Sequence, residues 1–260
     1  MRIENTWQVS RSVLDVNSVQ ECANHLTSSM QAVLAELSCP ETDPLLAGDW
    51  VANRLEDPQH NLADNEISIL RGHFPAKIRL HHAVVDLARE LHSNGFLTSI
   101  FSQQFRYLHM PPMARFVLPG NRGAGVPPHF DWQYNTHMSS FANVWVPAVP
   151  ISNQCGGVTV WEAAGGVDLR TDEMSDGIKS SGLVRTWHEG VITDGLIKHD
   201  CSPMALGDVL TFGSGVLHGS MPNTSTRTRI SMEFRFLPDG ASSSKPVWDL
   251  KSGELLPNVG

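Results

Sequence analysis

The sequence predicts a mainly β fold of the jelly-roll type, a barrel or a sandwich, with helices on its N-terminal side. Apolar residues recur at helical spacing within the first hundred of its 260 residues. After about residue 100, short runs rich in β-branched and aromatic residues alternate with Gly, Pro and Asn. No internal repeat and no long linker rich in Pro, Gly or Ser divides the chain. We therefore expect the helices and strands to share one core.

Two helical regions are expected in the N-terminal part. The first covers 18–37, where apolar residues recur at helical spacing and Ser18 is suited to cap the N-terminus. The second covers about 75–93 and is expected to end at Asn94 and Gly95, because Gly commonly follows the last turn of a helix.

The expected strands are short and lie at the spacing of a jelly roll. Each is a run of β-branched or aromatic residues bounded by turn-forming residues. They cover residues 114–118, 142–149, 158–162, 184–187, 209–212 and 229–237.

The chain is expected to form a single domain over 1–260. A mainly helical flank over 1–105 precedes the β core over 106–238. Within the core, a polar, Gly-rich interval from about 163 to 201 is long enough to form a lid over one end of the barrel. The tail over 239–260 contains Gly and several Ser residues, so we expect it to be loosely ordered.

Composition and charge exclude several classes of function. Acidic residues outnumber basic ones by 27 to 19, so the chain lacks the broad cationic surface that nucleic acids and anionic membranes require. There is no secretory signal pattern at the start and no long apolar run, which predicts a cytoplasmic protein. The 4 cysteines lie far apart, so we expect free thiols rather than disulfides or a zinc site.

A metal site is indicated by His129, Asp131 and His218. In His129-Phe130-Asp131 the two ligand types are two residues apart, so on a strand they point to the same side. His218 follows a Gly-Asp turn and a β-rich run, at the expected start of another strand. Two imidazoles and one carboxylate form the facial triad that suits non-haem Fe(II), and zinc would more often recruit a third His or a Cys.

An anion site is indicated eleven residues after His218, by Arg229 and Ser231. On a strand these two side chains share one face. An Arg guanidinium can bind a carboxylate with two hydrogen bonds, and a neighbouring hydroxyl can add another. The pair is suited to the distal carboxylate of a dicarboxylate co-substrate such as 2-oxoglutarate.

Between about residues 105 and 237 the chain carries a series of short motifs whose order and spacing can be compared with those of known families. The motifs are His129-Phe-Asp131, Asn143-Val-Trp145-Val-Pro147, Gly156-Gly157-Val-Thr159-Val, Gly207-Asp208, His218-Gly-Ser220, Asn223 and Arg229-Ile-Ser231. In this order they resemble the Fe(II)/2-oxoglutarate-dependent dioxygenases, and within them the phytanoyl-CoA dioxygenase-like branch. The chain departs from that branch at Glu162-Ala-Ala-Gly165-Gly166, where relatives commonly have Pro-Gly-Ser-His.

The resemblance implies a double-stranded β-helix core, cupin-like in architecture, with Fe(II) at the mouth of the barrel. It implies that His129, Asp131 and His218 are the catalytic iron ligands and that Arg229 and Ser231 bind 2-oxoglutarate, with O₂ as the second co-substrate. It further implies that the co-substrate pocket is lined by Asn143, Trp145 and Thr159. Halogenating relatives lack the carboxylate, so Asp131 favours hydroxylation of an unactivated C–H bond.

The expected substrate is a small metabolite, such as an amino acid or a natural-product intermediate. This follows from polar and aromatic residues near the predicted site, namely Arg115, Trp132, Gln133, Tyr134 and Trp161. The same iron chemistry can also give desaturation, epoxidation or rearrangement. Two other classes stay open: a non-catalytic β-barrel that senses or binds a metal, and a cupin-type metalloenzyme independent of 2-oxoglutarate. The sequence predicts no particular oligomeric state.

Overall fold

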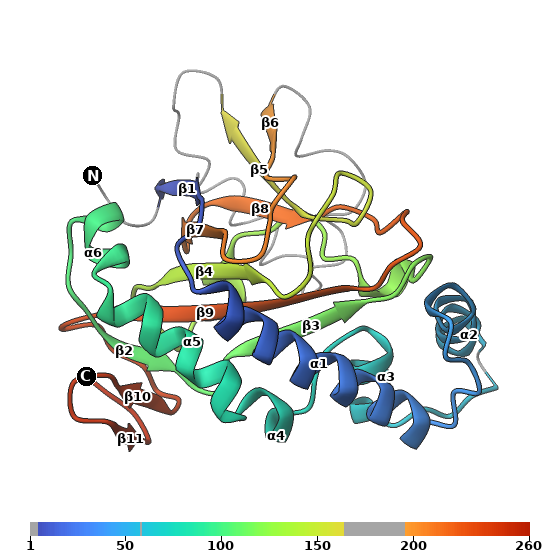
Figure 1. Cartoon of the computed structure of the whole chain (residues 1–260). Coiled ribbons are helices and arrows are strands. Elements are labelled where there is room, and N and C mark those ends of the chain that lie inside the picture. Colours follow the sequence, from blue (N-terminus) through green and yellow to red (C-terminus); the bar gives the residue numbers. More distant parts are fainter. Residues whose placement is uncertain (1–4, 58, 164–195) are drawn as a thin grey trace, which may run out of the picture.

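The structure, a computed structural model, describes residues 5–57, 59–163 and 196–260 (Figure 1). It is rich in antiparallel strands, with helices in its N-terminal part, as expected for a cupin-like fold. The strand expected at 184–187, and nearly all of the lid expected at 163–201, lie outside the described residues.

The helices gather in the first hundred residues. In α1, the carboxylate of Asp15 accepts hydrogen bonds from the backbone N–H groups of Asn17 and Ser18. The helix therefore begins before Ser18, which was expected to be the cap. The helical elements are α1 Val16–Glu36, α2 Pro44–Glu56, α3 Asp64–Leu70, α4 Ala76–Arg79, α5 His82–Ser93, α6 Phe96–Phe101, the 3-10 helix η2 Arg122–Ala124 and α7 Asp131–Tyr134.

The region expected to be one helix over 75–93 is two helices, α4 and α5. The break lies at His81, whose backbone is extended and whose Nδ1 accepts a hydrogen bond from the N–H of Ala83. An imidazole thus caps α5, which the apolar periodicity alone does not show. The expected end is confirmed, because Asn94 is the C-cap and Gly95 adopts a positive φ of 70°.

Two antiparallel sheets form the β part. The large sheet has the order β1-β7-β4-β9-β2-β10-β11, with β3 also paired to β9, and the small sheet has the order β6-β5-β8. The strands are β1 Trp7–Ser10, β2 Phe105–His109, β3 Met113–Val117, β4 Ala142–Pro147, β5 Val158–Ala163, β6 Leu196–Asp200, β7 Val209–Gly213, β8 Leu217–Ser220, β9 Arg229–Pro238, β10 Val247–Asp249 and β11 Glu254–Leu256.

The terminal segments also contribute strands, which the sequence does not predict. Strand β1, within the flank expected to be helical, pairs with β7. The tail expected to be loosely ordered carries β10 and β11, and β10 pairs with β2. Its Asp249 accepts two hydrogen bonds from the guanidinium of Arg106, at 3.1 and 2.9 Å. These strands have only 3 or 4 residues, too few for a visible alternation.

Strand β9 separates the apolar core from the interior of the β part. Its residues Ile230, Met232, Phe234 and Phe236 belong to the core cluster that includes the helices, and each is at most 2% exposed. The alternate residues face the other way, because side chains of a strand alternate between its two faces. Helices α1 and α5 cover the first face, and the small sheet lies on the opposite side (Figure 1).

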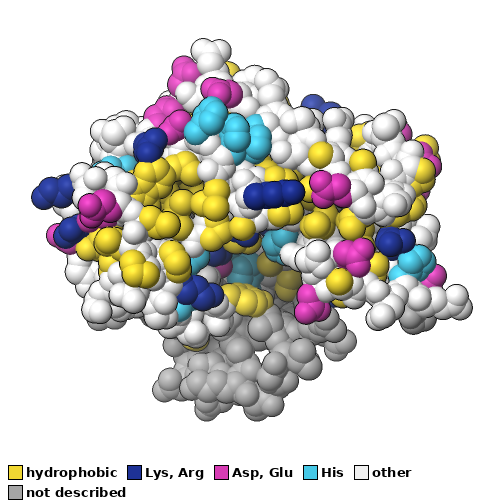
Figure 2. All heavy atoms as spheres, turned by 90° about the horizontal axis from the view of Figure 1, so that it is seen from below, with side chains coloured by type: hydrophobic (Ala, Val, Ile, Leu, Met, Phe, Trp, Pro, Cys, Tyr) yellow, Lys and Arg dark blue, Asp and Glu magenta, His cyan; other side chains and the backbone are white. Residues whose placement is uncertain are grey.

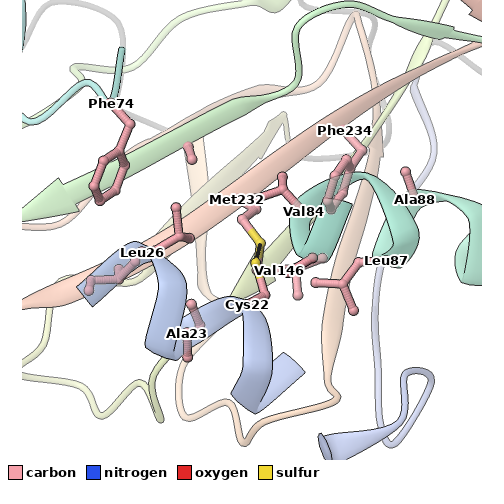
Figure 3. Packing of buried hydrophobic residues seen from close by; sticks show 14 of the residues in the cluster. Cys22, Ala23, Leu26, Phe74, Val84, Leu87, Ala88, Val146, Met232 and Phe234 are labelled. Carbon is pink, nitrogen blue, oxygen red and sulfur yellow. Dashed lines mark hydrogen bonds between the residues drawn. The ribbon is translucent and has the colours of Figure 1, made fainter. Parts of the chain in front are cut away.

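The core between helices and sheet is closely packed (Figure 3). Leu26 of α1 and Val84 of α5 lie against strand residues, and the thiol of Cys22 is 3.0 Å from the sulfur of Met232. All 4 cysteines are free, as expected.

Two properties of the described residues bear on binding partners: the distribution of surface charge, and the length and apolar character of the helices. On the face shown in Figure 2, their basic side chains are scattered among acidic and hydrophobic ones and form no continuous patch. This face is hollowed near its centre. Within the described part of the chain, no helix combines the length and apolar character that crossing a membrane requires.

Truncating the core should destabilise the protein strongly. Leu26 is 0% exposed, so Leu26→Ala is expected to lower the free energy of unfolding by about 2–5 kcal/mol, through lost burial and a cavity. Urea denaturation measures this. Leu46 is 52% exposed on α2, so Leu46→Ala is the matched control, with an expected change within about 0.5 kcal/mol. Equal losses in both variants would contradict the packing described.

Candidate metal centre and anion site

His129 and His218 face each other through a short antiparallel bridge. The N–H of His129 donates to the carbonyl of His218 at 2.8 Å, and the N–H of His218 donates back at 3.0 Å. The ring centroids are consequently 4.2 Å apart. Residues 89 positions apart in sequence (218 − 129) thus become direct neighbours.

Backbone carbonyls determine which nitrogen of each imidazole is free. His129 Nδ1 is 2.8 Å from the carbonyl oxygen of Pro127, and His218 Nδ1 is 2.9 Å from that of Val216. Because a carbonyl can only accept a hydrogen bond, both Nδ1 atoms carry the proton in the neutral rings. Each Nε2 therefore keeps its lone pair, as a metal ligand must.

Asp131 completes the group from the first turn of α7. Its Oδ1 is 3.5 Å from His129 Nε2 and its Oδ2 is 3.9 Å from His218 Nε2. One ligand atom from each of the three residues lies within 4.8 Å of the others, and all three side chains are buried. The three predicted ligands are thus brought together.

The donor set and its burial fit a ferrous ion. Asp131 Oδ2 is buried without a hydrogen-bond partner among the described residues, so its charge is only partly compensated. A cation between this oxygen and the two free Nε2 atoms would satisfy all three. Two imidazoles and one carboxylate, with the other positions open, suit non-haem Fe(II).

Electrostatics keep two of the ligands in their metal-binding forms near neutral pH. Burial and the neighbouring His129 lower the pKa of His218 to about 4, so its imidazole is neutral. Burial alone would raise the pKa of Asp131, but Arg235 and the two imidazoles outweigh burial and hold this pKa well below its usual range. Asp131 is therefore ionised.

Arg235 and Glu233 belong to this site and were not among the predicted residues. Arg235 Nη2 is 3.6 Å from Asp131 Oδ1 and 2.5 Å from Glu233 Oε1. Both lie on β9, and both line the cavity that contains the metal ligands. The signal was available in the sequence, because polar residues occupy every second position from Arg229 to Arg235.

Arg229 is a buried cation without an acidic partner. It is 2% exposed, and no carboxylate of the described residues lies within the 4.0 Å that defines an ion pair. Its Nη1 donates to the carbonyl of Gly156, while its Nε has no partner among the described residues. Burial and the nearby Arg115 lower its pKa to about 9, which leaves it charged at neutral pH.

Gly156 is required at this contact. Its φ is +75°, and a Cβ there would lie 2.6 Å from the carbonyl oxygen of Met221. Only Gly allows this approach without displacing the backbone. The Gly-Gly motif therefore has a structural role beside Arg229.

One cavity of about 720 Å³ contains both features. The three metal ligands line it together with Arg229 and Ser231. Three further predicted residues line it as well: Trp145, Arg115 and Tyr134. The ring of Tyr134 lies edge-on to that of His129, with 5.2 Å between the centroids. Metal ligands and buried cation thus open onto one space.

The other predicted site residues do not line this cavity. Thr159 is fully buried and donates its hydroxyl to Asp200 at 2.8 Å, and Asn143 is also fully buried. Trp132 and Trp161 pack against a small cluster formed by Phe130 and Leu217. Gln133 accepts a hydrogen bond from the N–H of Phe130. The expectation that these five residues line the co-substrate or substrate pocket stays a prediction. Asn143, Trp132 and Gln133 each have a buried polar atom without a hydrogen-bond partner among the described residues.

Comparisons with known proteins bear on the fold. No family model and no curated protein matches the chain, whereas 239 chains of solved structures do. One is the non-haem α-ketoglutarate-dependent epimerase SnoN from nogalamycin biosynthesis, 12% identical with a TM-score of 0.53, covering 92% of this chain and 81% of SnoN.

Two more structures have similar scores. AviO1 from Streptomyces viridochromogenes Tue57 is 14% identical, with a TM-score of 0.54 and 92% of each chain covered. The non-haem monooxygenase ThoJ in complex with Ni is 11% identical, with a TM-score of 0.54, covering 93% of this chain and 77% of ThoJ. At such identities the similarity shows a shared fold.

Removing a metal ligand should abolish metal binding. In His218→Ala the two remaining ligands cannot hold the ion, so Fe(II) affinity is expected to fall more than about a hundredfold. Anaerobic equilibrium dialysis measures this. His199→Ala is the matched control, because His199 lies on β6 and pairs with Glu162 instead. Metal bound equally by His218→Ala and wild type would contradict the assignment.

His73, in the cavity wall, should make stability depend on pH. Burial and Arg115 lower its pKa to about 4, whereas the unfolded chain protonates it near pH 6.5. The folded state then binds fewer protons, so the free energy of unfolding falls as the pH drops from about 6.5 to about 4. In His73→Gln this fall should be smaller, as measured by urea denaturation of metal-free protein at pH 7 and pH 5. An unchanged fall would contradict the prediction.

Proposed function

We propose that the protein is an Fe(II)- and 2-oxoglutarate-dependent dioxygenase that hydroxylates an unactivated C–H bond of a small metabolite. One observation carries the proposal. The buried group of His129, Asp131 and His218 shares a cavity with Arg229, a buried cation that no described acid neutralises. A metal centre and an anion site in one cavity are what a co-substrate with two carboxylates requires.

The three ligands would hold the iron from one side and leave its other positions open to the cavity. Bound there with 2-oxoglutarate and O₂, iron supplies the power to oxidise an unactivated C–H bond, with release of succinate and CO₂. The protein's own contribution is positioning. The carbonyls of Pro127 and Val216 keep the protons on the Nδ1 atoms, and Arg235 keeps Asp131 ionised.

Arg229 and Ser231 would hold the distal carboxylate of 2-oxoglutarate. Both line the cavity, and both are buried, so water competes weakly for their hydrogen bonds. The unpartnered Nε of Arg229 is a donor that a carboxylate can satisfy. By holding the distal carboxylate, Arg229 and Ser231 would orient the co-substrate so that its 2-oxo acid end faces the metal.

The finer family assignment is also part of the proposal. From the motif order we assign the chain to the phytanoyl-CoA dioxygenase-like branch, and we expect its two sheets to form a double-stranded β-helix. The shared fold with structures described as an α-ketoglutarate-dependent epimerase and a non-haem monooxygenase supports the wider superfamily. Those descriptions differ in outcome, so product analysis must distinguish hydroxylation from desaturation, epoxidation and rearrangement.

The proposal also covers the class of substrate, the partners and the cellular location. A cavity of about 720 Å³ has the size of a small-molecule site, and its lining mixes polar with aromatic groups such as Tyr134 and Trp145. We place the activity in the cytoplasm, without a nucleic-acid or membrane partner.

Arg229 provides the test of the co-substrate. Arg229→Ala removes a charge-assisted contact of roughly 1.5–3 kcal/mol, so 2-oxoglutarate affinity should fall roughly tenfold to a hundredfold. Anaerobic calorimetry of the Fe(II)-loaded protein measures this, and metal binding should be retained. Arg227→Ala, at an exposed position on the same segment, should leave the affinity unchanged. Unaltered affinity in Arg229→Ala would place the co-substrate elsewhere.

Succinate release separates the proposal from the two alternatives. A library of small metabolites, assayed with Fe(II), O₂ and 2-oxoglutarate, should contain compounds that stimulate succinate formation. A non-catalytic metal-binding barrel would form none with any compound. A cupin-type metalloenzyme would transform its substrate with 2-oxoglutarate withheld.

A further inference from the structure

Arg115 lies beside the residues assigned to the co-substrate. Strands β3 and β9 pair antiparallel, and Arg115 is directly opposite Ser231 in the register. Directly opposed residues point to the same face of a sheet. Arg115 therefore projects to the same side as Ser231 and Arg229, and all three line the cavity.

Arg115 and Arg229 are neighbouring cations, and neither forms an ion pair with a described acid. Arg229 has no acidic neighbour among the described residues, whereas Glu233 acts on Arg115 and only partly offsets the effect of its burial. Among residues 5–57, 59–163 and 196–260, no acidic side chain forms an ion pair with either guanidinium within 4.0 Å. The pKa of Arg229 is lowered to about 9, first by burial and second by the charge of Arg115, so the two guanidiniums are close enough to repel each other. A buried cation without an acid, held beside a second cation that Glu233 compensates only in part, is costly unless an anion joins them.

Each guanidinium also has one N–H donor without a hydrogen-bond partner among the described residues. Nη2 of Arg115 donates to the carbonyls of Arg71, at 3.0 Å, and Ala124, at 2.8 Å, which fixes the side chain. Its Nε is buried without a partner among the described residues, and so is the Nε of Arg229. Buried N–H groups nearly always have an acceptor, and here two neighbouring cations each have one without a partner. A single anion between them could accept from both.

We propose that Arg115 and Arg229 together bind the distal carboxylate of 2-oxoglutarate, so that Arg115 sets the affinity and selectivity for the co-substrate instead of contacting the substrate. This inference rests on the proposed function. It changes the role expected for Arg115, which the sequence places among substrate residues. A carboxylate has two oxygens and can accept from both guanidiniums at once.

The test compares two 2-oxoacids that differ only at the distal end. 2-Oxoglutarate carries the second carboxylate, and 2-oxobutanoate lacks it but keeps the same metal-chelating group. Both are titrated anaerobically into Fe(II)-loaded wild type and Arg115→Gln, and the visible absorption of the Fe(II)–2-oxoacid chelate gives each dissociation constant.

Arg115→Gln should weaken 2-oxoglutarate binding by roughly tenfold or more and change 2-oxobutanoate binding by less than about twofold. Arg115→Lys should recover only part of the loss, because an ammonium lacks the planar donor pair. Arg227→Gln is the matched control, because Arg227 is exposed and does not line the cavity, and it should change neither constant.

Two results would overturn the inference while leaving the proposed function intact. Equal weakening of both acids would show that Arg115 only supports the loops at Arg71 and Ala124. No weakening of either would show that Arg115 does not touch the co-substrate. Failure of the proposed function is a separate result, in which wild type gives no absorption with 2-oxoglutarate.

Discussion

Two backbone hydrogen bonds between His129 and His218 are the contact on which the rest of the site depends. They join the segment before α7 to β8 and so place both imidazoles on one side of the cavity. The nearby carbonyls of Pro127 and Val216 then select the nitrogen that faces inward. Asp131 follows from the same segment. Hydrogen bonds of the main chain therefore set the relative position of the two imidazoles and the orientation of their rings.

Strand β9 connects the stability of the fold with its chemistry. One face buries Met232 and Phe234 under the helices, and the other presents Arg229, Ser231, Glu233 and Arg235 to the cavity. A shift of one residue in its pairing would exchange these faces. The hydrophobic core thus fixes the register that places the cations, so helices distant from the metal centre contribute to its geometry.

Residue types and short spacings in the sequence indicated His129, Asp131 and His218, and the structure brings these three side chains together. Arg235 and Glu233 were equally readable in the alternation of β9, but their importance depends on the distance to Asp131, which no local pattern contains. Asn143 and Thr159 lie on predicted strands and are fully buried, and neither is among the residues that line the cavity. Strands β10 and β11 were missed because their stability comes from pairing, of β10 with β2 and of β11 with β10, which no local pattern shows.

A crystal structure of the protein with Fe(II) and 2-oxoglutarate, grown without oxygen, would show the metal centre and the anion site together. We expect electron density for one metal ion between the Nε2 atoms of His129 and His218 and the carboxylate of Asp131. We also expect the far carboxylate of the co-substrate against Arg229. A metal ion bound elsewhere, or an Arg229 that contacts only protein atoms while 2-oxoglutarate is present, would contradict this assignment.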